Sequence, residues 1–178
     1  MKSTVRLSVL YPPGPPEIQG YQEGEVVRMG DTLALSCISR GGNPLAALVW
    51  FKNNEQVDHS FTTRGKQSLN VLSFVVGAAD NNAIFRCDAS NKETTEAMSV
   101  AVKLTVHFSP GKAVIDGPKE ASAGDVITMF CKTERSNPPA DISWVIDGRR
   151  TPSTDSVKAD PQGGWITSSN ITCDSYGV

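Results

Sequence analysis

The stretch GDTLALSC at residues 30–37, followed thirteen residues after its cysteine by Trp50, decides the fold of this chain. Within it, Leu33, Leu35 and Cys37 alternate with small or polar residues. An alternation with a period of two is typical of a β-strand that buries one face. The stretch therefore predicts a strand whose cysteine points into a core.

The same pattern recurs in the second half of the chain. GDVITMFC ends at Cys131, and Trp144 again follows the cysteine by thirteen residues. Cys131 lies 94 residues after Cys37, and LTVHFSPG at residues 104–111 lies 97 residues after LSVLYPPG at residues 7–14. A repeat of roughly this length predicts two tandem domains.

The composition favours a folded all-β chain. Of the 178 residues, 39% are hydrophobic and 20% are charged, and 15 glycines and 11 prolines supply turns between short strands. The net charge of −2 shows no basic excess for nucleic acid or a membrane surface. The longest nearly apolar run, residues 71–79, is too short for a membrane span, and the sequence MKSTVRL at the start has no signal-peptide character. An extracellular assignment therefore requires that this chain be part of a longer one.

The spacing of cysteine and tryptophan resembles the immunoglobulin superfamily. Its members join a strand B cysteine to a strand F cysteine across two sheets and pack a strand C tryptophan against the bridge. The resemblance implies a disulfide between Cys37 and Cys87, with Trp50 and Trp144 in the cores of tandem immunoglobulin-like sandwiches of the I-set or C2 type. Two free buried thiols in a cytosolic domain are the alternative. Phe85 stands where the family usually has a tyrosine, so the tyrosine-corner hydrogen bond is not expected.

The second domain is expected to be truncated at its C-terminal end. The offset of 94 residues places the partner of Cys131 past the end of the chain and matches Cys173 to Ala79. The same offset matches Asp80, Ala83 and Ile84 to Asp174, Gly177 and Val178, so most of strands F and G would be missing. A direct bridge from Cys131 to Cys173 stays open. We expect a last strand of a preceding domain plus linker at 1–11, a complete domain at 12–108, and a partial domain at 109–178.

Several phrases narrow the resemblance to nephrin and its invertebrate relatives, Sticks and stones and Hibris. They are the proline-rich VLYPPGPP at residues 9–16, NPPADISW at residues 137–144, and the GGW at residues 163–165. The resemblance implies an extracellular segment of a single-pass cell-surface adhesion receptor. It also implies that these domains space and orient a recognition domain for heterophilic binding to immunoglobulin proteins of the Neph, Kirre and Roughest type. No binding residue of that family maps onto this chain.

Other function classes remain as alternatives. A receptor ectodomain for a soluble ligand and a structural module of an intracellular muscle protein both use this fold. The muscle module would keep its thiols reduced, because the cytosol is reducing. The proline-rich junctions at residues 12–16 and 108–111 predict stiff linkers, with an ordinary proline turn as the alternative.

Few residues offer chemistry. Asn170 begins the single Asn-x-Ser/Thr sequence and is a glycosylation candidate, although such sequences also occur by chance. His59 and His107 have no ligand-spaced partners, and we interpret them as surface histidines. Neither a nucleophile motif nor a phosphate-binding loop is present, so we expect no enzyme activity, no cofactor and no metal site.

Overall fold

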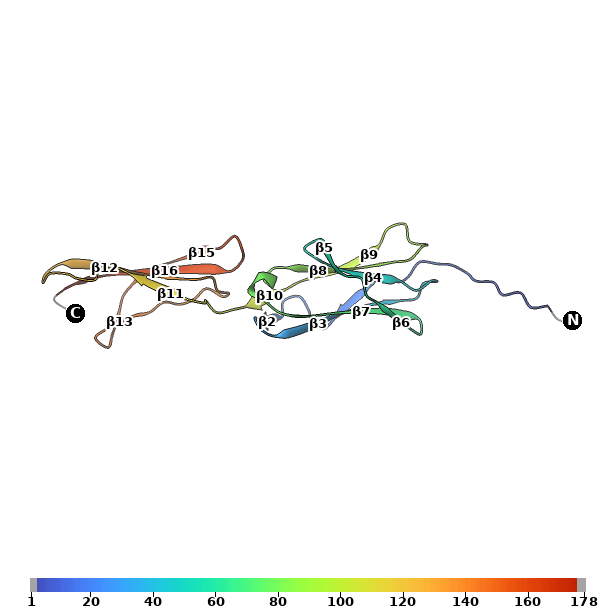
Figure 1. The fold of residues 1–178 in the computed structure, drawn as a ribbon, viewed down its shortest axis with the longest axis horizontal. Helices are drawn as coiled ribbons and strands as arrows, with labels where there is room; N and C mark the ends of the chain where they lie inside the picture. The colour runs from blue at the N-terminus through green and yellow to red at the C-terminus, as the bar shows by residue number, and fades with distance from the viewer. Residues whose placement is uncertain (1–2, 176–178) are drawn as a thin grey trace. The chain divides into compact units, whose positions relative to one another are not determined.

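The computed structural model describes residues 3–175 as β-strands joined by turns (Figure 1). It divides into two units, Met1–Thr105 and Val106–Val178. The single helical element in the described part is the 3-10 turn η1, Ala78–Asp80. The all-β prediction is confirmed. Between residues 3 and 175 no helix is long and apolar enough to cross a membrane.

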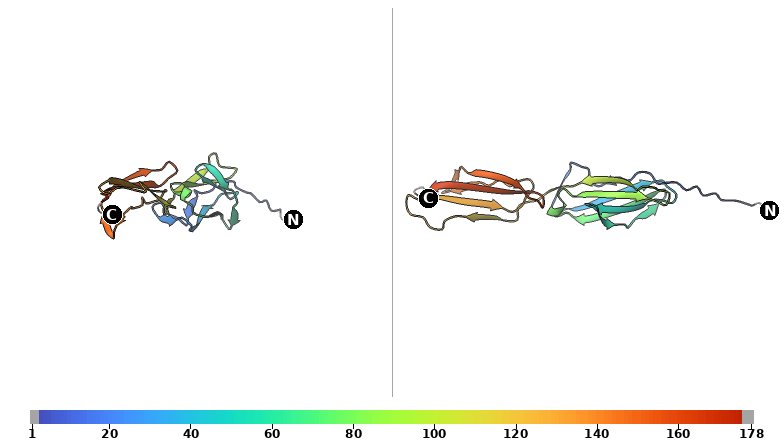
Figure 2. Two further views of the ribbon diagram at one scale, coloured as in Figure 1. Left: turned by 60° about the vertical axis from the view of Figure 1, so that its left-hand side comes forward. Right: turned by 90° about the horizontal axis from the view of Figure 1, so that it is seen from above.

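Two four-stranded antiparallel sheets form the body of the first unit. Their strand orders are β1–β3–β7–β6 and β5–β4–β8–β9. Figure 2 shows these strands running alongside one another. Two facing sheets of this kind make an immunoglobulin-type sandwich. The strands are β1 Glu17–Gln19, β3 Thr32–Arg40, β4 Ala47–Lys52, β5 Glu55–Asp58, β6 Thr62–Arg64, β7 Gln67–Val75, β8 Ile84–Ser90 and β9 Met98–Lys103.

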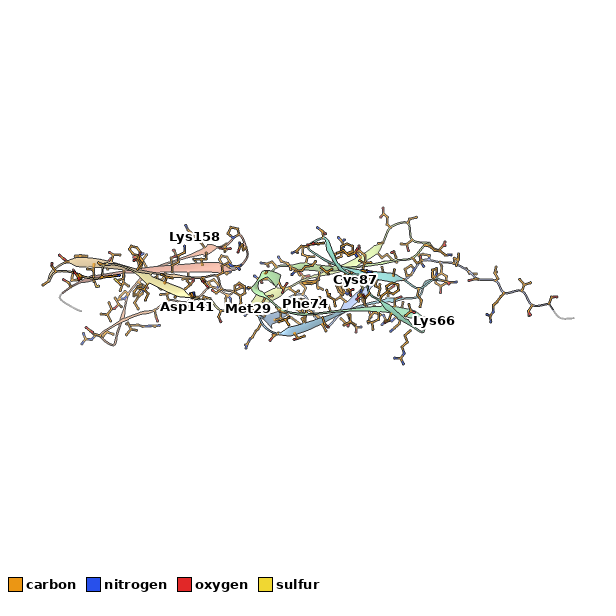
Figure 3. All side chains as sticks on the ribbon, in the orientation of Figure 1. Met29, Lys66, Phe74, Cys87, Asp141 and Lys158 are labelled. Atoms are coloured by element: carbon orange, nitrogen blue, oxygen red, sulfur yellow. A yellow bond between two sulfur atoms is a disulfide. The ribbon has the colours of Figure 1, made fainter. Side chains whose placement is uncertain are left out.

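The core of the first unit follows the predicted alternation. Leu33, Leu35 and Cys37 of β3 are buried, while the residues between them are more exposed. Phe74 of β7 and Phe85 of β8 stack with their ring centroids 4.9 Å apart. Phe74 and Cys87, labelled in Figure 3, come from opposite sheets. The aromatic ring of Phe85 thus fills the core although it lacks a hydroxyl group.

A different tyrosine, Tyr21, uses its hydroxyl inside the first unit. Its side chain is buried, and Oη donates to the carbonyl of Glu25 at 2.7 Å and lies 3.3 Å from the carbonyl of Lys103. The same oxygen accepts the backbone N–H of Thr105 at 3.1 Å. The hydrogen bonds of Tyr21 therefore connect the end of β9 to the loop after β1. That loop leads to β2 (Val26–Arg28), which pairs with β10 (Thr105–His107).

The second unit contains one four-stranded sheet, in the order β11–β12–β16–β15, and a separate hairpin of β13 and β14. Inward-facing residues of the sheet are buried, among them Cys131, Ser169 and Ile171. The outward residues Val126 and Phe130 are 67% and 54% exposed. The strands are β11 Ala113–Asp116, β12 Val126–Thr133, β13 Trp144–Ile146, β14 Arg149–Thr151, β15 Thr154–Ala159 and β16 Trp165–Asp174.

The register of this sheet corrects the predicted match of Cys173 to Ala79. In the first unit Thr62 pairs with Leu69, seven residues later, whereas in the second Ser156 pairs with Ser168, twelve residues later. The β15–β16 hairpin is thus longer by five residues, which raises the offset between the units from 94 to 99. Hairpin tips tolerate such insertions because they lie outside the core.

Cys173 accordingly occupies the place of Phe74, since Cys173 pairs with Ile127 as Phe74 pairs with Leu33. Asp174 likewise matches Val75 rather than Asp80, because Asp174 pairs with Val126 as Val75 pairs with Thr32. The predicted matches to Gly177 and Val178 lie outside the described residues.

The register also places Cys131 and Cys173 apart. Cys131 pairs with Ser169, four residues before Cys173 on the same strand. Four strand residues span roughly 13 Å, whereas disulfide-linked Cα atoms lie within about 7 Å. Both thiols are free, so the structure does not form the bridge that the sequence left open.

Candidate functional site

The disulfide expected from the resemblance is present at the centre of the first unit. Cys37 of β3 and Cys87 of β8 are joined with a Cα–Cα distance of 6.4 Å, which links the two sheets. Trp50 is fully buried and pairs with Cys87 across β4 and β8. Its Nε1 donates to the carbonyl of Asn70 at 3.3 Å. The large ring and the bridge thus form a rigid core that holds the outer surfaces in place.

The tryptophan of the second unit does not reach the buried core position predicted for it: Trp144 is only half-buried, because its hairpin β13–β14 belongs to no larger second sheet in the described part of the chain. Nε1 of Trp144 donates to Oγ of Ser169 at 2.8 Å, and Oγ of Ser169 donates to Asp155. Hydrogen bonds from Ser169 and Ser153 lower the pKa of Asp155, because they stabilise its ionised form. A chain of side-chain hydrogen bonds therefore links the β13 tryptophan to β15 and β16.

Each unit holds its incoming strand with the same contact, which we call the entry clamp. In the first unit it joins Asn43 to Val9 and Tyr11. The backbones of Tyr11 and Asn43 exchange two hydrogen bonds of 3.1 and 3.0 Å, and Nδ2 of Asn43 donates to the carbonyl of Val9 at 2.7 Å. Asn91 adds a hydrogen bond of 2.9 Å from Nδ2 to the carbonyl of Tyr11.

In the second unit the entry clamp joins Asn137 to Val106 and Phe108. The backbones of Phe108 and Asn137 exchange two hydrogen bonds of 2.9 Å, and Nδ2 of Asn137 donates to Val106 at 2.8 Å. Both asparagines precede a cis proline. The Asn-Pro pair recurs 94 residues apart in the sequence, but the contacts of its asparagines are visible only in the folded units. The recurrence of asparagine, at the same distance from both tryptophans, was the available signal.

The GGW element completes the entry clamp of the second unit. It lies at the tip of the lengthened β15–β16 hairpin, where the backbones of Trp165 and Ser136 exchange hydrogen bonds of 2.8 and 2.9 Å. Gly164 has a positive φ of 82°, and a Cβ there would lie 2.7 Å from the Phe108 ring. Glycine is therefore required for the hairpin tip to approach the clamp.

The outer face of the sheet β5–β4–β8–β9 carries an ordered polar cluster. The guanidinium carbon of Arg86 lies 4.5 Å from the centre of the Phe51 ring, and its Nε donates to Asp88 at 2.9 Å. Ser99 also donates to Asp88 at 2.7 Å, and Asn54 accepts from Arg86 at 3.0 Å. Asp88 thus balances the charge of Arg86 within this cluster.

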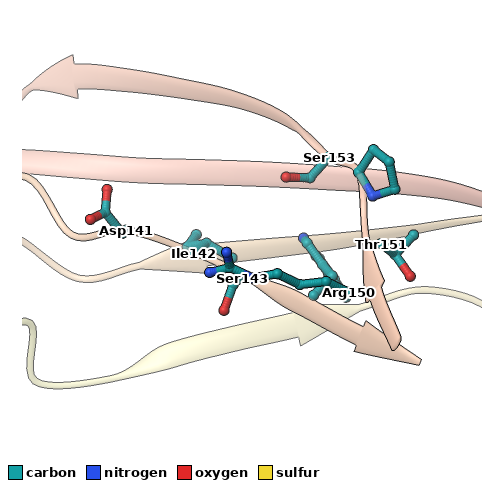
Figure 4. Close-up of a pocket in the computed structure, with 8 residues that line it drawn as sticks. Asp141, Ile142, Ser143, Arg150, Thr151 and Ser153 are labelled. Carbon is teal, nitrogen blue, oxygen red and sulfur yellow. The ribbon is translucent and has the colours of Figure 1, made fainter. Parts of the chain in front are cut away.

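A hollow of about 520 Å³ beside the β13–β14 hairpin is a second candidate site (Figure 4). It contains one cation, Arg150, and one carboxylate, Asp141. In the described part of the chain, no group of three or more metal-ligating side chains is brought together. The arrangement thus offers no catalytic or metal-binding constellation. The hollow is lined by Asp141, Ile142, Ser143, Trp144, Arg150, Thr151, Pro152 and Ser153.

The remaining candidates from the sequence are two histidines and one asparagine. His59 is exposed and His107 is partly exposed. Asn170 lies on β16, half-exposed on the outer face of the second sheet. His107 lies between Val106 and Phe108 of the second entry clamp, and Asn170 follows Ser169 along β16.

Comparisons with known proteins agree with the fold. A model described as "Immunoglobulin domain" matches residues 15–91, and one described as "CD80-like C2-set immunoglobulin domain" matches residues 110–174. The solved structure described as "Crystal Structure of Rst D1-D2" superposes with a TM-score of 0.60 at 17% identity, covering 90% of this chain and 84% of that one. At that identity the likeness shows the fold alone.

Two curated relatives extend over most of the chain. Mouse nephrin is 36% identical over 177 residues, covering 97% of this chain but 14% of nephrin. Cell adhesion molecule 2 of Xenopus tropicalis is 26% identical, covering 84% of this chain and 36% of that protein. The chain therefore spans only a small part of these relatives. With two immunoglobulin domain matches and relatives that are adhesion proteins rather than enzymes, the chain belongs to the immunoglobulin superfamily and is similar to nephrin.

Proposed function

We propose that this chain is an extracellular segment of a cell-surface adhesion receptor. Its immunoglobulin units act as spacers that orient a recognition domain located elsewhere in the receptor. The partners are immunoglobulin proteins of the Neph, Kirre and Roughest type on an adjoining cell. The similarity to nephrin and to cell adhesion molecule 2 supports the adhesion class.

The observation that carries the proposal is the exposed apolar segment that precedes β1. Leu7 and Val9 are 85% and 64% exposed, whereas their counterparts Leu104 and Val106 are fully buried. Apolar side chains that alternate along a segment and are exposed to water indicate a missing cover. Residues 1–11 are therefore proposed to be the last strand and linker of a preceding immunoglobulin domain.

The two entry clamps support the spacer role. Each fixes the path of the incoming strand relative to its own unit by two backbone hydrogen bonds and one asparagine side chain. Contacts of this kind restrict the linker residues next to each unit, as a spacer requires.

Cell aggregation tests the proposal in the longer receptor that contains this chain. Cells carrying the intact receptor are mixed with cells displaying Neph-, Kirre- or Roughest-type ectodomains, because dense display compensates for weak single contacts. Deletion of residues 12–108 is expected to reduce aggregation. Replacement by an unrelated immunoglobulin domain of equal length is expected to restore it, while binding of a soluble clustered partner stays unchanged in all three receptors.

Two results would contradict the proposal. If the deletion of residues 12–108 abolishes binding of the soluble partner and the unrelated domain does not restore it, these residues themselves recognise the partner and are not a spacer. If the intact receptor aggregates with none of the three partner types but binds a secreted ligand, the receptor belongs to the soluble-ligand class. Reduced thiols at Cys37 and Cys87 in the native protein would instead favour the intracellular muscle class.

A further inference from the structure

Asn170 lies on the outer face of the second unit, and its side chain forms no hydrogen bond with the described residues. It lies on the central strand β16, between Phe130 of β12 and Thr154 of β15. Its neighbours Ser169 and Ile171 are buried on the opposite face, so Asn170 points outward. Its amide forms no hydrogen bond to any described residue, whereas the amides of Asn43, Asn91 and Asn137 are engaged. The Asn170 amide is therefore free to be modified.

The rest of the sequon shares this face. Thr172 follows Asn170 by two residues, so both side chains point outward, and Thr172 is exposed beside Thr128 at 3.3 Å. The residue between them, Ile171, is 2% exposed and anchors the strand. The acceptor amide and the hydroxyl that defines the sequon thus lie together on one accessible surface.

An exposed aromatic ring stands directly opposite the acceptor. Phe130 pairs with Asn170 and is 54% exposed in the middle of β12. Side chains that pair across strands have Cβ atoms about 5 Å apart. A sugar attached to Asn170 would lie within reach of this ring and could cover it with the apolar face of its C–H groups.

We propose that Asn170 carries an N-linked glycan whose first N-acetylglucosamine packs on Phe130. The transfer forms a bond from C1 of that sugar to Nδ2 of Asn170 and breaks the bond from C1 to the pyrophosphate of a polyprenyl-pyrophosphate oligosaccharide. One amide proton leaves, together with the polyprenyl pyrophosphate. The glycan shields the outer face of β12 and β16 from protein partners. The first unit has no sequon, so its faces stay open.

Secretion of the chain from animal cells behind an added signal peptide tests occupancy. The chain and the variant S168A, on the same face but outside the sequon, are expected to lose the mass of a glycan on treatment with peptide-N-glycosidase. N170Q and T172A are expected to lack that mass, and T172S to keep it. A secreted chain with an oxidised Cys37–Cys87 pair and unmodified Asn170 would overturn the proposal while leaving the adhesion function intact.

A double-mutant cycle tests the contact with Phe130. Thermal midpoints of the second unit are compared for the glycosylated chain, N170Q, F130S and the double variant. N170Q is expected to lower the midpoint when Phe130 is present and to leave it unchanged in the F130S background. Equal shifts in both backgrounds would show that the glycan does not pack on this ring. Reduced thiols at Cys37 and Cys87 would refute the proposed extracellular adhesion function. This measurement is independent of the glycan measurements.

Discussion

Removal of the disulfide from the first unit lowers its free energy of unfolding by an amount that follows from the length of the enclosed loop. Cys37 and Cys87 are separated by 50 residues along the chain. Cross-linking a loop of that length restricts the unfolded chain, and the chain-entropy relation gives about 4 kcal/mol at room temperature. The double variant C37A/C87A is therefore expected to lower the free energy of unfolding of the first unit by about 4 kcal/mol. That is a large part of the roughly 5–15 kcal/mol typical of a domain.

Urea denaturation followed by tryptophan fluorescence measures this loss. Trp50 is the single tryptophan of the first unit and pairs with Cys87, so its emission reports the region of the bridge. With a denaturant slope of about 2 kcal/mol per molar urea, the midpoint of the first unit falls by roughly 2 M.

The matched control removes the two thiols that the structure leaves free. C131A/C173A is expected to leave the transition of the first unit in place, because both residues lie in the second unit. A loss below about 1 kcal/mol in C37A/C87A would refute the reasoning, since the loop entropy would then not be restricted by a bond.

Three further outcomes are expected. N43A deletes the two hydrogen bonds from Nδ2 of Asn43, to Val9 and to Ser8, each worth about 1 kcal/mol, and should speed amide hydrogen exchange at Tyr11; unchanged exchange would mean that the clamp is not maintained in solution. G164A forces a Cβ to within 2.7 Å of the Phe108 ring and should lower the thermal midpoint of the second unit, whereas a neutral effect would show that the hairpin tip moves freely. The pKa of Asp155 is lower in the folded chain than its ordinary value of 3.8, so the ionised carboxylate stabilises the second unit fully above pH 3.8, and this stabilisation is lost as the pH falls through the folded-state pKa. D155N should therefore lower the thermal midpoint of the second unit at pH 7 but not at a pH below the folded-state pKa, which thermal melts across pH would show.

The sequence was most informative where apolar and polar residues alternate with the period of two that a β-strand has. Alternation around Cys37 and Cys131 predicted inward-facing cysteines, and both are buried. Resemblance to a known family then supplied the partner of Cys37. Neither signal identified hydrogen-bond partners, because Asn43 and Tyr11, which bond to each other, are 32 positions apart along the chain.

The failure at Cys173 has a definite cause. A constant offset assumes equal loops, but the β15–β16 hairpin contains five additional residues. Lengthening a hairpin loop by a few residues costs little free energy, so a sequence can contain the insertion without any change in composition or in the alternation of the strands. Only the register of the paired strands showed that Cys173 occupies the place of Phe74 rather than that of Ala79.

From its sequence alone, this protein is determined to be a tandem of two β-rich domains, because the pattern repeats along the chain and because buried and exposed side chains alternate along every strand that covers a core. The resemblance to the immunoglobulin superfamily added the expectation of sandwiches. The tertiary structure alone decided which strands pair in which register, how each asparagine clamps an incoming strand, and which face presents Asn170 beside Phe130. The physical reason is distance along the chain. Alternation is a local property of neighbouring residues, whereas these contacts form between segments that only the folded sheets bring together.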